Sequence, residues 1–185
     1  MNKLQLRKIM LEKRKNFSNT YMNSSNLIIT NKVIEFIKNH NFKNICIYLS
    51  TKYEVETRKI IDYCFLNNIK VFVPRVLENN DMKMIRYLDH NHNSLNKFNI
   101  YEPSNDQTIN SSDIDCIFTP LVAFDKNLNR IGMGKGFYDK FFNLNKNNYL
   151  KVGLSFDQQL ISDDILKDDH DVKLDIIITE KSIYN

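Results

Sequence analysis

A short glycine-rich segment holds the residues best suited to chemistry. Residues 129–139 read Asn-Arg-Ile-Gly-Met-Gly-Lys-Gly-Phe-Tyr-Asp and contain three of the four glycines of the chain. Alternating glycines permit positive φ angles and leave backbone N–H groups uncovered, so an anion can approach them closely. Arg130 and Lys135 add cations suited to a polyphosphate, and Asp139 adds a carboxylate of the kind that binds magnesium beside phosphates. The segment therefore predicts a phosphate-binding loop.

This loop differs from the two common nucleotide-binding motifs. Asn129 stands where a Walker A motif has its first glycine, and Gly136 stands where that motif has Ser or Thr. Phe137 occupies the third glycine position of a dinucleotide fingerprint. A helix is expected to begin at about Gly136, and a helix N-terminus favours negative charge. A tight turn carrying a solvated lysine is the alternative interpretation of the same residues.

A second polar segment follows an apolar run. Residues 49–57 read Leu-Ser-Thr-Lys-Tyr-Glu-Val-Glu-Thr. If the apolar run is a buried strand, the segment lies at its carboxyl end, where open α/β sheets bind ligands. Glu54 is suited to accept hydrogen bonds from an amino-bearing heterocycle. The alternative is that this acid only complements the dipole of the next helix.

The histidines give a weaker signal. None has the spacing of a zinc site, and His90 and His92 lie in a polar stretch, so we expect them at the surface. His170 and Asp171 form a His-Asp pair before the last apolar run. No nucleophile accompanies this pair, so a hydrolase triad is not expected.

The elements that must position these residues alternate along the chain. Helices are expected over 2–16, 18–40 and 57–68 and from 136 to about 142. Strands are expected over 44–49, 70–73, 83–88, 114–119, 150–156 and 174–178. Ser18 is a suitable N-cap, Pro74 is expected to end the second strand, and the polar stretch 89–112 is read as a loop. This alternation predicts one three-layer α/β domain over residues 1–185, a mostly parallel sheet with helices on both faces.

Composition excludes several classes of protein. Lys+Arg total 26 against 22 Asp+Glu, and a net charge of +4 is too small to indicate a nucleic-acid or membrane partner. No run of eighteen apolar residues is present. Three cysteines without CxxC spacing indicate a reducing compartment. The basic N-terminal segment is read as an ordinary first helix, which predicts a cytoplasmic protein, with a mitochondrial transit peptide as the alternative. A monomer is expected.

Seven segments, in order along the chain, resemble the 5-formyltetrahydrofolate cyclo-ligase (methenyltetrahydrofolate synthetase) family. They are residues 3–7, 53–57, 73–75, 101–103, 119–125, 130–139 and 170–180. The sixth is close to the family pattern Arg-Leu-Gly-x-Gly-x-Gly-Tyr-Tyr-Asp. Phe137 departs from it by removing a hydroxyl, and Leu121 and Thr119 replace a frequent glycine and an apolar residue.

The resemblance implies that 5-formyltetrahydrofolate and ATP give 5,10-methenyltetrahydrofolate, ADP and phosphate, with the formyl oxygen phosphorylated on the way. It implies an ATP site made of Lys3, Arg7, Arg130, Ile131, Gly132, Met133, Gly134, Lys135, Gly136, Phe137 and Tyr138. It implies folate contacts from Leu49, Glu54, Met84, Phe137 and Tyr138. Catalytic roles fall to Lys135, Arg130 and Tyr138. Asp139 and Asp171 would ligate Mg²⁺.

Two other functions compete with this interpretation. A sugar-phosphate isomerase on a similar sheet would use the glycine loop without needing ATP. An RNA-binding module would use the Lys-rich first helix. The lysines and aromatic residues form no alternating platform on which bases could stack, which argues against the second alternative.

Overall fold

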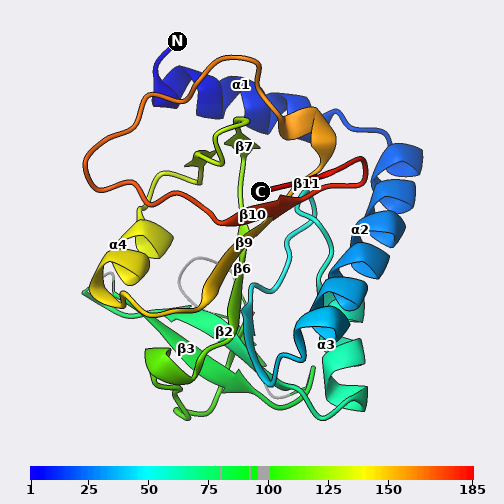
Figure 1. Cartoon of the computed structure of the whole chain (residues 1–185), viewed down its shortest axis with the longest axis vertical. Coiled ribbons are helices and arrows are strands. Elements are labelled where there is room, and N and C mark those ends of the chain that lie inside the picture. Colours follow the sequence, from blue (N-terminus) through cyan, green and yellow to red (C-terminus); the bar gives the residue numbers. More distant parts are fainter. Residues whose placement is uncertain (80, 92, 96–100) are drawn as a thin grey trace.

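Five parallel strands form the centre of a seven-stranded mixed sheet (Figure 1). The computed structural model describes residues 1–79, 81–91, 93–95 and 101–185. The helices are α1 (Lys3–Lys15), α2 (Asn19–His40), α3 (Arg58–Leu66), α4 (Phe137–Leu144) and the short 3-10 turns η1 (Ser111–Asp113) and η2 (Asp157–Gln159). The strands are β1 (Asn44–Ile47), β2 (Lys70–Val76), β3 (Met82–Tyr87), β4 (Asn93–Leu95), β5 (Tyr101–Pro103), β6 (Cys116–Pro120), β7 (Ala123–Phe124), β8 (Arg130–Ile131), β9 (Leu150–Leu154), β10 (Ile176–Ile178) and β11 (Ile183–Tyr184).

The strand order places a switch point in the middle of the sheet. The order is β11-β10-β9-β6-β1-β2-β3, and the two edge strands are antiparallel to their neighbours. The chain proceeds from β1 to β2 in one direction and from β6 to β9 and β10 in the other, so the order reverses between β1 and β6. In open α/β sheets, ligands bind outside the carboxyl ends of the strands at such a point.

Helices cover both faces of the sheet, as predicted. Helices α2 and α3 lie on one face, α4 lies on the other, and α1 crosses the carboxyl end of the sheet (Figure 1). Ile45 and Ile47 pack into the core under α2 and α3, whereas Cys46 between them packs into the core that includes Phe141 and Phe142 of α4. A strand buried on both faces explains the continuous apolar runs. None of the described helices is both long and apolar enough to cross a membrane.

Helix α1 begins where the sequence supplies a capping box. The Asn2 side chain accepts a hydrogen bond from the Gln5 N–H at 2.9 Å, and the Gln5 side-chain oxygen accepts one from the Asn2 N–H. Basic residues fill the last turn, which suits the helix dipole. Met10 packs with Val122 and Ile131, so this helix is held against the β7–β8 hairpin that leads into the glycine loop.

Pro74 does not end the second strand. Strand β1 pairs with residues 70–72 only, so Pro74 lies beyond that ladder and its missing N–H costs no bond there. Pairing with β3 on the other side continues to Val76 opposite Met82. The first strand, in contrast, ends two residues earlier than predicted, because the Tyr48 carbonyl accepts a bond from the Thr57 hydroxyl instead of continuing a ladder.

Three short pairings were not predicted. The hairpins β7–β8 and β10–β11 and the β4–β5 pair use strands of two or three residues, too short for a periodic signal. The last pair corrects the reading of 89–112 as a loop. His90 is half-buried and bonds Asp62 at 2.7 Å, which corrects its expected surface position, and His92 lies outside the described residues.

Gly153 provides a test of packing in the sheet. A Cβ atom there would lie 2.7 Å from Leu174 Cδ1 and 2.8 Å from Leu121 Cδ2. We expect Gly153→Ala to lower the free energy of unfolding by about 1–3 kcal/mol through overpacking, measured by urea denaturation. Gly132→Ala is the matched control, because a Cβ there meets nothing within 4 Å. Equal unfolding midpoints for Gly153→Ala and this control would contradict the packing described.

Candidate active site

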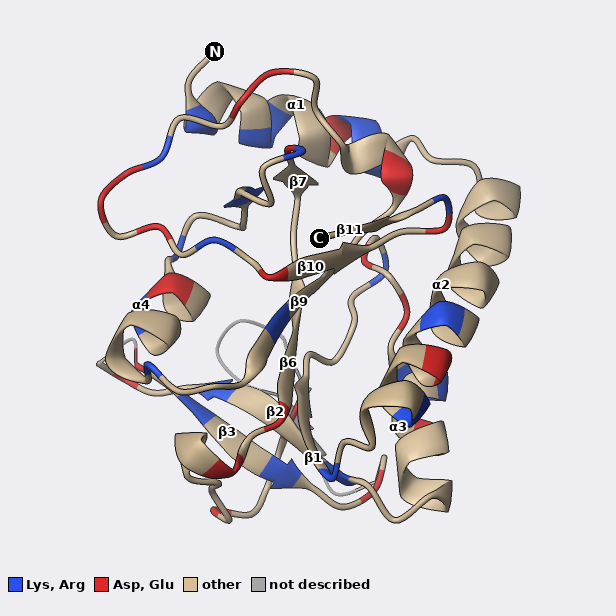
Figure 2. Cartoon of the chain, in the orientation of Figure 1, with Lys and Arg blue, Asp and Glu red and all other residues tan. Residues whose placement is uncertain are grey.

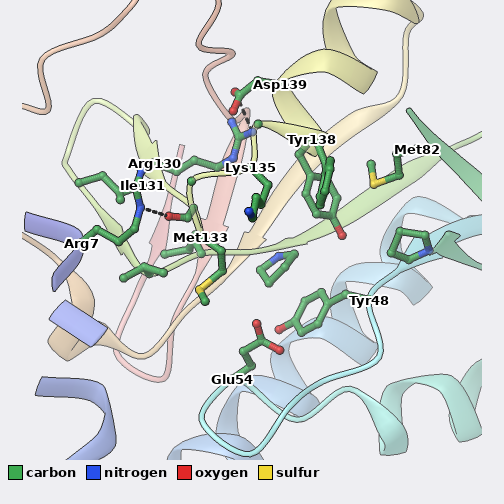
Figure 3. Close-up of a pocket in the computed structure, with 18 of the residues that line it drawn as sticks. Arg7, Tyr48, Glu54, Met82, Arg130, Ile131, Met133, Lys135, Tyr138 and Asp139 are labelled. Atoms are coloured by element: carbon green, nitrogen blue, oxygen red, sulfur yellow. Dashed lines mark hydrogen bonds and ion pairs between the residues drawn. The ribbon is translucent and has the colours of Figure 1, made fainter. Parts of the chain in front are cut away.

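A cavity of about 710 Å³ opens at the switch point between β1 and β6 (Figure 3). Its floor includes Tyr48 and Leu49 after β1 and Pro120 and Leu121 at the end of β6. One wall is formed by α1, and another by the glycine loop and the start of α4. Acidic residues of the segment before β10 run near the basic residues of α1 (Figure 2). Segments far apart in the sequence thus enclose one charged chamber.

The glycine loop has the geometry that its sequence predicted. Gly134 and Gly136 have φ angles of +90° and +67°, which residues with a Cβ adopt only at a cost. Within the described chain no side chain caps α4, whose N-cap is Gly136, so its first N–H groups are left for a ligand. The Arg7 Nε–H donates to the Gly132 carbonyl at 2.7 Å and fixes the loop against α1. The result is a cradle of uncovered N–H groups that Arg7 holds against α1.

Two loop residues bring polar groups to the cavity. The Lys135 side-chain nitrogen is turned into the pocket (Figure 3), and among the described residues this lysine makes no ion pair. Tyr138 also lines the pocket. Burial, followed by the negative charge of Glu54, raises the pKa of the Tyr138 hydroxyl well above its ordinary value. Tyr138 is therefore a neutral hydrogen-bond donor at physiological pH.

Arg130 and Asp139 are bonded to each other rather than left free. The Arg130 side chain is 5% exposed and its Nη2 lies 2.8 Å from Asp139 Oδ1. Arg130 also donates to the Val172 carbonyl, and Asp139 accepts from the Val172 N–H at 3.0 Å. Burial lowers the pKa of the Arg130 guanidinium, while Asp139 counteracts that effect. This pair ties the start of the glycine loop to α4 and to the segment before β10.

Lys3 bridges two carboxylates at the mouth of the cavity. Its Nζ lies 2.7 Å from Asp168 Oδ2 and also bonds Asp171. Burial by itself would raise the pKa of the Asp171 carboxyl, but the bonds from Lys3 and from the Asp168 N–H outweigh it and hold that pKa below its usual range. Burial would likewise lower the pKa of Lys3, but the two carboxylates raise it.

The donor set at this mouth is suited to a hard divalent cation. Among the described residues, ligand atoms of Asp168, His170 and Asp171 lie within 4.8 Å of one another, and Asp139 is not in that group. Mg²⁺ is commonly held by one or two carboxylates together with substrate phosphates. The carboxylates already hold the positive charge of Lys3, and they border the same cavity as the glycine loop. The residues therefore fit magnesium bound together with a polyphosphate.

The end of the cavity away from the glycine loop combines one carboxylate with apolar walls. Glu54 Oε2 accepts from the Thr51 N–H at 2.8 Å and from its hydroxyl at 2.9 Å. Leu49 and Met82 add apolar surface. The Tyr48 hydroxyl donates to the Val55 carbonyl at 3.0 Å, which holds the loop that carries Glu54. A flat heterocycle with N–H donors suits this end.

The structure brings the predicted site residues together with one exception. Met84 is 2% exposed, packs in the core beneath α4 and is absent from the described lining. Strand β3 is antiparallel and begins at the carboxyl edge of the sheet, so Met82 lies nearer the cavity than Met84. The sequence therefore named Met84, whereas the residue on the same strand face that lines the cavity is Met82, two positions earlier.

Several lining residues were not predicted. They are Leu4, Arg14, Tyr48, Thr51, Pro74, Val76, Met82, Glu102, Pro120, Leu121, Val122, Asp168 and His170. For Arg14, the sequence contained a spacing that could have identified it as a site residue. It lies seven residues after Arg7 and eleven after Lys3, the spacing of one helix face.

Comparison with known proteins shows the family to which the chain belongs. The profile of the 5-formyltetrahydrofolate cyclo-ligase family matches residues 1–180. The 5-formyltetrahydrofolate cyclo-ligase of Mycoplasma genitalium is 33% identical over 96% of this chain and 98% of its own. A probable 5-formyltetrahydrofolate cyclo-ligase of Schizosaccharomyces pombe is 32% identical over 100% of this chain and 98% of its own.

A solved structure extends the match to the fold. The 5,10-methenyltetrahydrofolate synthetase of Aquifex aeolicus superposes with a TM-score of 0.85 and 28% identity, covering 99% of this chain and 92% of that one. Family profile, relatives and fold all extend over nearly the whole chain. The chain therefore belongs to the 5-formyltetrahydrofolate cyclo-ligase family, and it is a ligase of folate one-carbon metabolism.

Proposed function

We propose that the protein closes 5-formyltetrahydrofolate to 5,10-methenyltetrahydrofolate in an ATP- and Mg²⁺-dependent reaction through a phosphorylated formyl group. The observation that carries the proposal is one continuous cavity that joins a glycine-loop cradle at one end to a carboxylate with apolar walls at the other. Phosphoryl transfer needs positioning and charge neutralisation more than a protein nucleophile. The cavity offers cations, amides and carboxylates, in agreement with that need.

ATP binds at the glycine-loop end in this proposal. The amides of the loop and of the first turn of α4 hold the phosphates, and Lys3 and Arg7 flank them from α1. Lys135 follows the transferred group because its side chain is exposed and unpaired among the described residues. The Arg130–Asp139 pair holds the loop in place. We assign Arg130 a positioning role on these contacts.

The pterin ring of the folate binds at the other end, with Glu54 accepting from its amino edge and Leu49, Phe137 and Tyr138 against its faces. The formyl oxygen attacks the γ-phosphorus, and the bond from that phosphorus to ADP breaks. The bridging aniline nitrogen then attacks the formyl carbon, loses its proton and expels phosphate as the five-membered ring closes. The Tyr138 hydroxyl, neutral as argued above, donates to the oxygen that carries the phosphoryl group.

Magnesium, when bound, would neutralise charge on the phosphates. Asp171 and Asp168 would hold it, because their carboxylates border the cavity beside the loop. Asp139 also stays a proposed ligand, through the oxygen that Arg130 leaves unbonded. Lys3 would then move from the carboxylates to the phosphates.

Absorbance in the methenyl-folate band tests the proposal directly. Purified protein mixed with 5-formyltetrahydrofolate, MgCl₂ and ATP is expected to produce a rise that is absent when ATP is omitted. Glu54→Gln keeps the size of the side chain and removes its charge, and we expect it to raise KM for the folate about 10- to 100-fold. No rise with folded wild-type protein would contradict the proposal. Binding of a sugar phosphate by the same protein would then favour the isomerase alternative.

A further inference from the structure

An arginine is buried in the wall of the cavity without a full set of partners. Arg14, in the last turn of α1, is 5% exposed and lines the cavity. Its Nη1 lies 3.4 Å from the Leu121 carbonyl, at the long limit of a hydrogen bond. Among the described residues its Nε has no partner. A buried cationic donor left unpaired is costly, so a ligand atom is the natural partner for it.

The helix places this arginine beyond the phosphate end of the site. Lys3, Arg7 and Arg14 fall within about 40° of one another around α1 at 100° per residue. The rise of 1.5 Å per residue separates Arg14 from Arg7 by about 10 Å along the axis. Arg7 already contacts the glycine loop, so Arg14 lies about two turns beyond it along the cavity wall.

Electrostatics link Arg14 with Glu54. Burial lowers the pKa of the Arg14 guanidinium, and the negative charge of Glu54 opposes that shift. An arginine nonetheless stays charged at neutral pH. The Glu54 bonds to Thr51 involve Oε2, and no bond to its Oε1 is present among the described residues. Both side chains line the same cavity, which therefore offers an open carboxylate oxygen and an open cationic N–H.

We propose that Arg14 binds the 4-oxo oxygen of the pterin while Glu54 accepts from the neighbouring N–H groups. This inference rests on the proposed function. Along one edge of a pterin the 2-amino group, the N3–H and the 4-oxo oxygen follow in order, two donors and then an acceptor. A carboxylate and a guanidinium that line one cavity complement that order. Because O4 is adjacent to the nitrogen that carries the formyl group, the contact also fixes the orientation of that end of the ring.

Equilibrium binding without ATP tests the contact. Arg14→Met replaces the guanidinium by an apolar side chain, and Lys15→Met removes the same charge from an exposed neighbouring position. By calorimetry we expect Arg14→Met to weaken 5-formyltetrahydrofolate binding about 10- to 100-fold, the value of one hydrogen bond to a charged group. We expect its Kd for ATP to stay within about twofold of wild type, and Lys15→Met to match wild type for both ligands.

A pair of ligands separates recognition from a merely structural role. Folic acid and aminopterin differ in carrying an oxygen or an amino group at position 4 of the ring. We expect Arg14→Met to lower the ratio of the aminopterin Kd to the folic acid Kd about tenfold. We expect its thermal midpoint to equal or exceed that of wild type, because an unpaired buried charge is removed. An unchanged ratio, or a folate Kd within twofold of wild type, would overturn the inference.

Two further arms keep the test decisive. If Arg14→Met does not fold, Arg14→Lys, which keeps the charge but has a different reach and a single donor group, is measured with the same ligand pair and is expected to lower the same ratio. If wild-type protein neither binds nor cyclises 5-formyltetrahydrofolate, the proposed function fails. If wild type does both and the Arg14 variants match it, only the assignment of Arg14 fails.

Discussion

Lys135→Met is expected to lower kcat about 100- to 1,000-fold, the range seen when one donor to developing charge is removed from an active site. The lysine stands between Gly134 and Gly136, both at positive φ, so the backbone holds its side chain over the cavity. It makes no ion pair among the described residues and is free to follow the phosphoryl group. An interaction that strengthens as charge moves appears in kcat more than in KM.

Steady-state kinetics with ATP and 5-formyltetrahydrofolate measure this effect. Lys146→Met is the matched control, because it removes the same charge from an exposed residue just after α4. The control is expected to keep wild-type kcat and KM. If Lys135→Met raises KM for ATP but leaves kcat within about threefold, the lysine serves only ground-state binding, and its proposed catalytic role is wrong.

Much of the fold follows from patterns that the sequence displays openly. Strands buried on both faces appear as continuous apolar runs, and Ser18 marks the start of α2 with a side-chain cap that the structure contains. Strands β7, β8 and β11 leave no such pattern, because two-residue strands are fixed by tertiary contacts. The prediction that Pro74 ends β2 was wrong. A proline disrupts a strand only where its missing N–H would have bonded a neighbouring strand, and β1 no longer pairs with β2 at Pro74.

The site was less predictable than the fold, for a physical reason. The glycine loop is a local motif, so spacing alone indicated an anion cradle. Met82 and Met84 share one strand face, and only the register with β2 decides which of them reaches the cavity. The spacing of Arg14 from Lys3 and Arg7 places it on their helix face, but only the position of α1 across the carboxyl end of the sheet shows that this face lines the cavity.

Arg130 supports the glycine loop through its bonds to neighbouring segments, whereas Lys135 of the same loop is turned into the cavity. The resemblance implied that Arg130 binds ATP and takes part in catalysis. In the structure the Arg130 guanidinium bonds Asp139 and the Val172 carbonyl, and its Cζ lies 5.4 Å from the centroid of the Phe142 ring. A preorganised cradle needs such a support, since a loop that reorganises on binding would lose part of its electrostatic benefit.

Gly134→Ala is expected to lower kcat/KM for ATP about 100-fold. Gly134 has a φ angle of +90°, and a Cβ there would lie 3.0 Å from Arg7 Cζ. The Arg7 side chain cannot yield easily, because its Nε–H is bonded to the Gly132 carbonyl. Backbone strain of about 1–3 kcal/mol adds to the displacement of this arginine. Both effects distort the amide cradle, so the loss is expected mainly as a higher KM for ATP.

The neighbouring glycines separate the two causes. At Gly136 the φ angle is +67° but a Cβ would meet nothing within 4 Å, so Gly136→Ala tests backbone strain alone. At Gly132 there is neither a positive φ nor a close atom, so Gly132→Ala tests the loss of flexibility alone. We expect the loss of kcat/KM to fall in the order Gly134, Gly136, Gly132. Equal losses at Gly134 and Gly136 would mean that the contact with Arg7 contributes nothing, and the largest loss at Gly132 would contradict the cradle geometry. The order therefore reports whether α1 and the glycine loop act as one rigid phosphate site.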